Sequence, residues 1–384
     1  MELGFLPEYK SPPALGDSLH PRKLEDLVNY PPRPYSSLEV EISTRCNLSC
    51  PSCPRTTFKR TWLDQDMSLG HFEQLSAHFN QFETIFFRGW GEPLLNPLFP
   101  EMARLAYQSG ARLALATNGV LPLDQGLWPY FDTIIYRLEC GRARTYERRN
   151  PAAQFGRVIF NISQVLHQRD SQSAHRPQIV IIFAKNRYTL NELPIYMDTA
   201  IRLRPDRVIF YQPCFHPRAA DWRGELPGEV DPGLLLKIDE RLKAMAADAQ
   251  VELINQKVDF DRPKGHHCVM GERRSLFLNW KGQAALCRFG ALPVAGGTYS
   301  HYQDGRLTQS RVVFLGSLLQ NGLDEIAKSW AMRELRASCR QGGLLFKTRQ
   351  NTLKKHTCYK FKGSKGQVLS LGDARIKSGV YSGR

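Results

Sequence analysis

The sequence predicts an α/β fold in which six parallel strands alternate with helices in an open, partial barrel, followed by a smaller region that contains cysteines. Short apolar runs typical of strands recur six times between residues 38 and 211, and most are separated by stretches with helical spacing. Such repeats indicate parallel βα units, and six strands are too few to close the eight-stranded barrel. In such folds chemistry takes place on the loops that leave the carboxyl ends of the strands.

The proline-rich residues 1–36 are predicted to form an N-terminal extension, and residues 37–255 the core domain. In the first strand Leu38, Val40 and Ile42 alternate with two glutamates. The other predicted strands are Thr84–Arg88, Arg112–Thr117, Thr133–Leu138, Gln178–Phe183 and Arg207–Tyr211. The predicted helices begin near Ser68, as an N-cap, and continue with Pro97–Ser109, Phe155–Gln168, Leu190–Arg202 and Leu234–Ala247.

Residues 256–362 are predicted to form a second domain, and residues 363–384 a basic tail. The clearest element of this domain is a hairpin, Ser275–Trp280 and Gln283–Cys287, with its turn at Lys281 and Gly282. A helix is expected around Leu323–Arg340, because two glycines follow it.

The composition of 384 residues, 42% hydrophobic and 23% charged, is that of an ordinary globular protein. No run approaches the roughly 18 apolar residues of a membrane helix, so we expect a cytoplasmic protein. The net charge of +15 is compatible with nucleic acid, an acidic peptide or a phosphorylated or carboxylated small substrate. Because the excess lies at both ends and in scattered arginines, we do not expect nucleic acid to be the partner.

Three cysteines follow the first strand at a spacing that suits an iron–sulfur cluster. Cys46, Cys50 and Cys53 form the pattern C-x3-C-x2-C, and Pro51 and Pro54 exclude a regular helix there. Three thiolates in one loop can each hold a corner of a [4Fe–4S] cluster, which leaves one iron open for a substrate or cofactor. A zinc knuckle that lacks its fourth ligand, or chance, is the alternative.

The second and third strands also end in distinctive sequences. Gly89, Gly91 and Glu92 follow the second strand, where glycine lets the backbone approach a ligand and the carboxylate suits an ammonium group. The third strand ends in Thr117–Gly119. Each could be a simple turn, but together with the cysteines they mark the same edge of the predicted sheet.

The order C-x3-C-x2-C, G-W-G-E-P-L-L and T-N-G resembles the radical S-adenosylmethionine (SAM) superfamily, and in particular its branch with a C-terminal SPASM or twitch domain; the similarity covers about residues 37–360. It implies a (β/α)6 partial barrel in which the open iron chelates SAM, whose reductive cleavage gives a 5′-deoxyadenosyl radical that abstracts a substrate hydrogen. Gly91 and Glu92 would bind the methionine ammonium. The residues that it assigns to cofactor binding are Gly89, Gly91, Glu92, Thr117, Asn118, Gly119 and Glu139.

The segment after the fourth strand departs from the family pattern. The family often has Ser-x-Asp-Gly there, whereas this chain has Arg137 in place of the serine and Glu139 in place of the aspartate. The residues from Thr145 still resemble the start of the family's next helix. An arginine in it would suit a carboxylate, but we favour solvent exposure for Arg148 and Arg149.

The C-terminal domain resembles the SPASM pattern incompletely, with four cysteines in place of seven. The resemblance assigns an auxiliary [4Fe–4S] cluster, as in the twitch form, to Cys268, Cys287, Cys339 and Cys358. A structural zinc on the same residues, or inert thiols, are the alternatives. His266 and His267 are expected to be loop residues and not ligands.

The predicted function is radical-based oxidation or modification of a peptide or small polar molecule, with an electron donor such as flavodoxin or ferredoxin. The alternatives are an RNA-modifying radical enzyme and a non-catalytic iron–sulfur or zinc scaffold. Cys140 and Cys214 follow the fourth and sixth strands, where a thiol can give a hydrogen atom to a substrate radical. Both can equally be small buried hydrophobic residues.

Overall fold

The computed structural model describes residues 33–150, 152–213, 215–226, 230–256, 275–303, 306–329 and 332–333. Its strands are β1 Tyr35–Val40, β2 Phe82–Phe87, β3 Arg112–Thr117, β4 Thr133–Arg137, β5 Gln178–Ala184, β6 Arg207–Tyr211, β7 Glu252–Asn255, β8 Ser275–Leu278, β9 Gln283–Ala285, β10 Thr298–Gln303, β11 Arg306–Arg311 and β12 Gly316–Ser317. Its α-helices are α2 Pro54–Thr57, α3 Leu69–Ser76, α4 Phe99–Gln108, α5 Ala143–Arg149, α6 Phe155–Ser171, α7 Leu193–Arg202, α8 Ala219–Arg223, α9 Pro232–Asp248 and α11 Leu323–Lys328.

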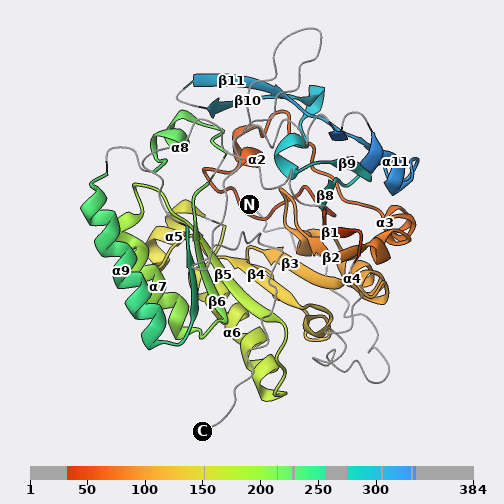
Figure 1. The fold of residues 1–384 in the computed structure, drawn as a ribbon. Coiled ribbons are helices and arrows are strands. Elements are labelled where there is room, and N and C mark those ends of the chain that lie inside the picture. The colour runs from red at the N-terminus through yellow and green to blue at the C-terminus, as the bar shows by residue number, and fades with distance from the viewer. Residues whose placement is uncertain are drawn as a thin grey trace, which may run out of the picture.

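One large curved sheet organises the described part of the chain, in the order β12-β9-β8-β1-β2-β3-β4-β5-β6-β7. Strands β1 to β7 run parallel to one another, and β8 pairs parallel with β1. Helices α3, α4, α6, α7 and α9 form the outer layer around the strands (Figure 1). The predicted α/β partial barrel is therefore confirmed.

Helices α3 and α9 begin where the sequence supplies a side-chain cap. The Ser68 hydroxyl accepts a hydrogen bond from the backbone N–H of His71 at 3.2 Å, and α3 then buries Phe72 and Leu75. At α9 the Asp231 carboxylate accepts hydrogen bonds from two backbone N–H groups, and Pro232 occupies the first turn, where its missing N–H costs nothing. At these two helices the local sequence determines where the helix starts.

The two faces of the strands bury different apolar clusters. In β5, Ile179, Ile181 and Phe183 belong to the large cluster shared with the helices, whereas Val180 and Ile182 belong to a small cluster on the opposite face. This inner cluster consists of Phe86, Ala114, Ile135, Val180, Ile182, Ile209 and Ile254. Because both faces are covered, the strands are almost continuously hydrophobic, as parallel strands generally are. The inner cluster fills part of the barrel interior, and polar side chains begin toward the carboxyl ends.

The sequence predicted six core strands, and the structure adds a seventh and an eighth. Strand β7 was not predicted, because its four residues follow the long helix α9 without a clear alternating pattern. The predicted hairpin is present as β8 and β9, but β8 also extends the core sheet through parallel pairing with β1. The predicted helix at 190–202 is a 3-10 turn followed by α7. The helix predicted around 323–340 is shorter: α11 ends at Lys328, where Ser329 has an extended ψ of 150°, and most of residues 330–340 lie outside the described part of the chain.

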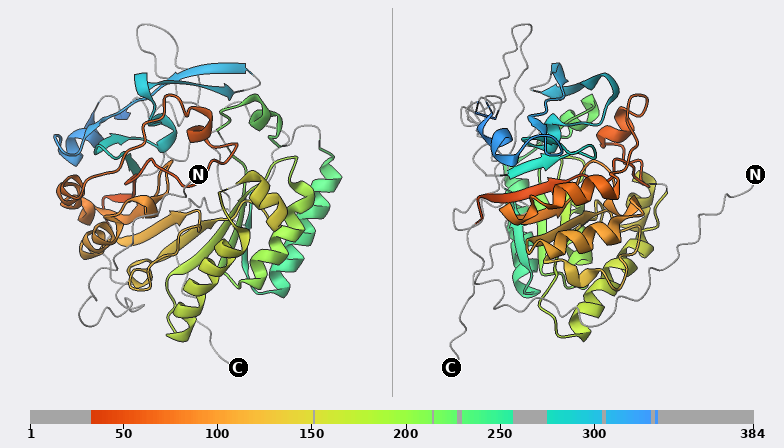
Figure 2. Two further views of the ribbon diagram at one scale, coloured as in Figure 1. Left: turned by 180° about the vertical axis from the view of Figure 1, so that it is seen from behind. Right: turned by 90° about the vertical axis from the view of Figure 1, so that its right-hand side faces the viewer.

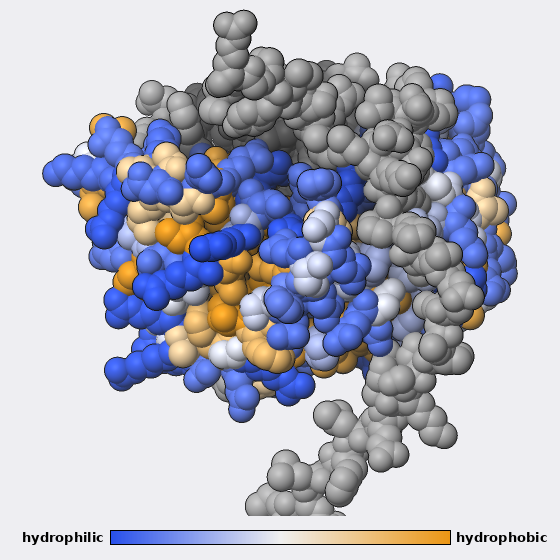
Figure 3. Space-filling view, turned by 90° about the horizontal axis from the view of Figure 1, so that it is seen from below, coloured by the Kyte–Doolittle hydropathy of each residue, from blue (hydrophilic) through white to orange (hydrophobic). Residues whose placement is uncertain are grey.

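A separate hairpin, β10–β11, crosses the carboxyl-terminal side of the barrel near α2 (Figures 1 and 2). It is joined to the loop after β6 by a hydrogen bond from Tyr302 N–H to the carbonyl of His216 at 2.8 Å. The coloured part of the face seen from below is mainly hydrophilic, and hydrophobic residues form patches among the hydrophilic ones (Figure 3). Within the described ranges no helix has the length and apolarity needed to cross a membrane.

Candidate functional site

The three cysteines after β1 line a cavity of about 450 Å³ at the carboxyl ends of the strands. Cys46, Cys50 and Cys53 are each partly exposed and none forms a disulfide. In the part of the chain that the structure describes, no three His, Cys, Asp or Glu side chains are grouped for a single metal ion. Each thiolate of a cubane cluster binds a different iron, so its sulfurs stand wider apart than the ligands of one ion. Three thiols that line one cavity suit a cluster that takes one thiolate at each of three corners.

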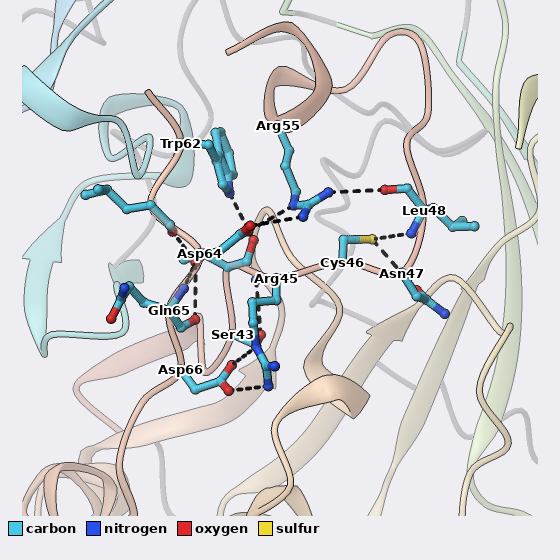
Figure 4. Close-up of polar contacts among 12 residues, drawn as sticks. Ser43, Arg45, Cys46, Asn47, Leu48, Arg55, Trp62, Asp64, Gln65 and Asp66 are labelled. Atoms are coloured by element: carbon cyan, nitrogen blue, oxygen red, sulfur yellow. Dashed lines mark hydrogen bonds and ion pairs between the residues drawn. The ribbon is translucent and has the colours of Figure 1, made fainter. Parts of the chain in front are cut away.

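The segment after the cysteines ties the loop down on one side (Figure 4). Arg45 forms an ion pair with Asp66, and its Nε donates to the same carboxylate at 3.1 Å. Arg55 pairs with Asp64 at 3.2 Å, and the indole N–H of Trp62 donates to the carbonyl of Thr44 at 3.0 Å. These contacts hold the loop in place with its thiols facing the cavity.

Burial keeps the three thiols protonated. Desolvation raises the pKa of Cys46 to about 11, with the Glu92 charge as the next cause. Desolvation also raises the pKa of Cys50 and of Cys53. Since a metal binds thiolates, an iron–sulfur cluster bound here would displace these protons and compensate the buried charge. The donor set is of the soft type that selects iron–sulfur clusters or zinc.

Glu92 links the loop after β2 to the end of β3. Its carboxylate accepts hydrogen bonds from the Thr117 hydroxyl and the Asn118 backbone N–H, both at 2.8 Å. The backbone N–H of Leu94 donates to it at 3.3 Å. Glu92 is 2% exposed, and burial raises its pKa to about 7 against the effect of these donors. Thr117 and Asn118 also line the cavity, so these residues of the two motifs meet as predicted.

The glycines after β2 line the cavity and also make room for neighbouring parts of the chain. A Cβ on Gly91 would lie 2.4 Å from the carbonyl oxygen of Ser43 and 2.5 Å from that of Arg45. A Cβ on Gly89 would meet the Glu41 side chain at 2.4 Å. Glu92 N–H donates to the Arg45 carbonyl at 2.7 Å across the same contact. The glycines therefore let the loop after β2 lie directly against the start of the cysteine loop.

The turn after β3 reaches the cysteine loop through Asn118. Its amide donates to the Asn47 side chain at 2.7 Å and lies 3.8 Å from the Cys46 sulfur. Gly119 adopts a positive φ of 74°, the left-handed region that favours glycine, and turns the chain away from the cavity. Of this motif, Thr117 and Asn118 face the site; Gly119 is not among the residues that line it.

The helix after β4 separates the two arginines for which we favoured solvent exposure. Arg148 is exposed, whereas Arg149 is half-buried and lines the cavity, so that expectation is wrong for Arg149. At the end of this helix, the side-chain carbonyl of Asn150 lies 2.9 Å from the Cys50 sulfur. Asn150 itself is 2% exposed, and no motif had pointed to it.

Arg137 and Glu139 both line the cavity and pair with each other at 3.3 Å. The phenol of Tyr211, at the end of β6, lies 3.3 Å from the Arg137 guanidinium. The pKa of Arg137 is raised, mainly by the Tyr211 charge and also by Glu139, while burial acts in the opposite direction. The residues that replace the family's serine and aspartate thus form an ion pair beside the cysteines.

Of the two candidate hydrogen donors, Cys140 and Cys214, the structure describes only the first. Cys140 has no exposed surface, belongs to the large apolar cluster and is not among the residues that line the cavity. Its sulfur lies 3.8 Å from the Arg149 guanidinium. This geometry favours a packing role for Cys140. Cys214 lies outside the described residues.

Of the four cysteines assigned to an auxiliary cluster, the structure describes Cys287. It is 4% exposed, follows β9 and lines the same cavity as the first three cysteines. Cys268, Cys339 and Cys358 lie outside the described residues, as do His266 and His267. The C-terminal region therefore contributes to the wall of the site.

Several lining residues were missed because they carry no local motif. Within the described ranges, buried polar atoms without a hydrogen-bond partner include the Tyr146 hydroxyl, Gln212 Nε2, Ser275 Oγ and Arg288 Nε, all of residues that line the cavity. The buried side chains of His216 and Glu225 also line it and lie 3.5 Å apart. Buried polar atoms normally have partners, so these atoms fit a cavity that holds a polar ligand.

Comparison with known proteins bears on the fold. No protein-family model matches the chain. It is 29% identical over 309 residues to a Pyrococcus furiosus protein described as "tungsten-containing aldehyde ferredoxin oxidoreductase cofactor-modifying protein", covering 75% of this chain and 80% of that protein.

Two solved structures share the architecture. SuiB from Streptococcus suis bound to S-adenosylmethionine has a TM-score of 0.54 at 12% identity; the match covers 79% of this chain and 66% of SuiB, just under two thirds. The enzyme anSMEcpe with bound AdoMet also has a TM-score of 0.54, at 13% identity, over 78% of this chain and 82% of that one. At such identities the likeness establishes the fold.

Proposed function

We propose that this chain is a radical SAM enzyme whose catalytic [4Fe–4S] cluster is held by Cys46, Cys50 and Cys53. One observation carries the proposal: these thiols and the Glu92–Thr117–Asn118 contacts follow three successive strands and lie on one cavity. The fold shared with two SAM-bound proteins supports it. A scaffold without a cofactor would have no use for a cavity lined by unpartnered polar atoms.

When bound, SAM and the cluster supply a 5′-deoxyadenosyl radical on one-electron reduction, and the chain positions what reacts. Glu92 offers remaining lone pairs to the ammonium group of SAM, because its three donors leave acceptor capacity on the carboxylate. Arg137, whose charge acts on Cys50, and Arg149 are cations on the cavity wall and suit the carboxylate of SAM. Gly89, Gly91, Gly119 and Glu139 shape or support this site.

We infer a peptide or a small polar molecule as the substrate, and oxidation or another modification as the outcome. Structures of SuiB with the precursor peptide SuiA, and of anSMEcpe with the Cp18Cys peptide, are relatives in fold. The Pyrococcus furiosus relative is named as a cofactor-modifying protein. The electron would come from a donor such as flavodoxin or ferredoxin. Cys214 remains a predicted hydrogen donor.

A second, auxiliary cluster on Cys268, Cys287, Cys339 and Cys358 is part of this proposal and would make the C-terminal region a SPASM or twitch-like domain. Its support is the position of Cys287 after the predicted hairpin, on the wall of the cavity. An auxiliary cluster there would lie close enough to the substrate to accept an electron or bind the substrate.

The test is production of 5′-deoxyadenosine by anaerobically reconstituted protein with dithionite and SAM. The wild type should form it, and the triple variant Cys46→Ala, Cys50→Ala, Cys53→Ala should form none, because the reactive cluster has lost its ligands. Ser49→Ala, an exposed change in the same loop, is the matched control and should retain both iron and activity.

Turnover by the triple variant, or none by the wild type, would overturn the proposal. The iron content of the triple variant separately reports on the auxiliary site. About four irons per chain, the content of one [4Fe–4S] cluster, are expected there. Zinc, or no metal, in that variant would rule out the auxiliary cluster and leave the first one standing.

A further inference from the structure

Two arginines from distant parts of the chain face the cavity. Arg88 follows β2, and its guanidinium, 12% exposed in its side chain, pairs with Glu39 at 3.4 Å. Arg288 follows β9 and lies over the rings of Trp90 and Phe289, at 5.5 and 5.1 Å from their centres. The indole of Trp90 in turn donates to the Arg288 carbonyl at 2.9 Å. These contacts hold the Arg288 side chain in place.

Among the described residues Arg288 forms no ion pair, and the carboxylate whose charge acts with it is that of Glu41. Its Nε is buried and has no hydrogen-bond partner in the described part of the chain. Arg88 is close enough for the Arg288 charge to lower its pKa, which burial, the larger cause, brings down to about 9. The neighbouring Glu41 is buried, and desolvation raises its pKa to about 8, so it is mostly protonated at neutral pH. Glu39 is the acid that pairs with Arg88.

The residues around Arg88 and Arg288 favour the binding of an anion over the binding of water. Phe86, Ile135 and Ile182 also line the cavity, and charges interact more strongly beside such apolar walls than in water. Gln212 Nε2 and Ser275 Oγ also line this cavity and are further donors without a hydrogen-bond partner in the described ranges. Arg137 lies near Cys50 and Cys53, whose charges act on it, and so belongs to the cofactor side. The Arg137 charge also acts on Arg88, so the Arg88–Arg288 pair adjoins the cofactor side and is left for a second ligand.

We propose that the substrate carries an anionic group, a phosphate or a carboxylate, that binds to Arg88 and Arg288. This inference rests on the proposed function, since it names the class of substrate for the same cavity. A guanidinium presents two N–H donors to two oxygens of one anion, a geometry that an ammonium group lacks. Arg288 sets the specificity, because within the described ranges its guanidinium forms no ion pair that the ligand would have to replace.

The experiment measures anion binding without turnover. Reconstituted protein with SAM bound and no reductant is titrated by calorimetry with inorganic phosphate and, separately, with acetate. The wild type should bind one of them saturably, and the preferred probe distinguishes a phosphate from a carboxylate substrate. Arg288→Gln should weaken that binding about tenfold or more, and Arg288→Lys should recover part of it. Arg112→Gln removes one positive charge at the start of β3, beside Glu83, and should bind like the wild type.

No saturable binding of either anion, or equal binding by Arg288→Gln and Arg112→Gln, would overturn the inference. Equal affinity of Arg288→Lys and the wild type would overturn the two-donor geometry. The two proposals can fail separately. If the wild type binds the anion but makes no 5′-deoxyadenosine, the proposed function is wrong. If the wild type makes 5′-deoxyadenosine but binds neither anion, only the anion site is wrong.

Discussion

At the scale of single residues, the Glu92 carboxylate has two roles: it holds neighbouring loops of the site together and it is a proposed binding group for SAM. Both of its oxygens accept hydrogen bonds from the protein, one from Leu94 and Thr117 and the other from Asn118. It thereby joins the loops after β2 and β3, while burial brings its pKa to about 7. If SAM binds here as proposed, the positive charge of its ammonium group would lower the pKa of Glu92 and favour the ionised carboxylate.

Glu92→Gln should destabilise the protein and weaken SAM binding. Either orientation of the new amide sets its NH2 group against a backbone N–H, of Leu94 or of Asn118, so one donor loses its acceptor. We expect a loss of about 1–3 kcal/mol in the free energy of unfolding, measured in urea. SAM affinity, measured by equilibrium dialysis, should fall as well. Glu73→Gln, on the exposed face of α3, should change neither, and equal behaviour of the two variants would contradict the role of Glu92.

Glu41 makes the stability of the protein depend on pH. Burial raises its pKa in the folded chain to about 8 from an ordinary value of 4.5. Its contribution to stability is therefore complete at a pH below the pKa that Glu41 has in the unfolded chain. The contribution is lost as the pH rises toward the pKa that Glu41 has in the folded chain. Unfolding free energy should fall by about 1.4 kcal/mol per pH unit between them.

Glu41→Gln removes this titration and keeps the shape of the side chain. Urea unfolding of the metal-free protein at pH 5.5, 6.5 and 7.5 should give a shallower decline for the variant than for the wild type. The remaining slope is attributed to other groups, Glu92 among them. Parallel pH profiles would show that Glu41 ionises normally in the folded chain.

At the scale of elements, close packing of neighbouring loops places the site. Gly91→Ala would push a Cβ against the backbone of Ser43–Arg45, and backbone cannot move aside as a flexible side chain can. We expect a loss of about 1–3 kcal/mol in stability and a lower iron content after reconstitution. Gly156→Ala is the matched control, because nothing lies within 4 Å of its added Cβ at the start of α6.

The control variant Gly156→Ala should raise the free energy of unfolding by about 0.5–1 kcal/mol, because alanine forms helices more readily than glycine. Unchanged iron content and stability in Gly91→Ala would mean that the cysteine loop does not depend on this contact. Urea unfolding and iron analysis of the two variants provide the comparison.

Elements with a local signal could be predicted, and elements defined by distant partners could not. Ser68 indicated the start of α3, and the apolar runs indicated β1 to β6, because caps and periodicity are local properties. Strand β7 has four residues and no repeating pattern of its own. The hairpin of β8 and β9 was recognised, but nothing within it shows that β8 pairs with β1, more than two hundred residues earlier.

At the scale of the whole molecule, strands from residues 37–255 and from residues 256–362 share one sheet. Leu278 in β8 has no exposed surface and pairs with Val40 of β1. Leu278→Ala should cost about 2–5 kcal/mol, and amide hydrogen exchange should accelerate in β1 and β2 as well as in β8. Leu236→Ala, an exposed position on α9, should leave exchange unchanged. Faster exchange confined to residues 275–303 would instead indicate a separately folding C-terminal region.

The site was predictable where its residues lie in one short segment and not where the fold assembles it. Cys46, Cys50 and Cys53 were recognised from their spacing, and Gly91 and Glu92 from their place after the second strand and the family resemblance; they lie on one cavity. Arg88, Gln212, Ser275 and Arg288 come from four separate strands or strand ends, and single arginines or glutamines carry no signal in a sequence. Burial without a hydrogen-bond partner among the described residues, which made Gln212, Ser275 and Arg288 conspicuous, is a property of the folded chain.

The central position of β1 has a consequence for how the protein acquires and keeps its metal. This strand is hydrogen-bonded on both sides, to β2 and to β8, so the base of the cysteine loop is built by the sheet and not by iron. In small zinc domains, by contrast, metal binding and folding are one event. For the proposed cluster this means that iron can be delivered to a finished chain, and that a cluster destroyed by oxygen can be replaced without remaking the protein around it.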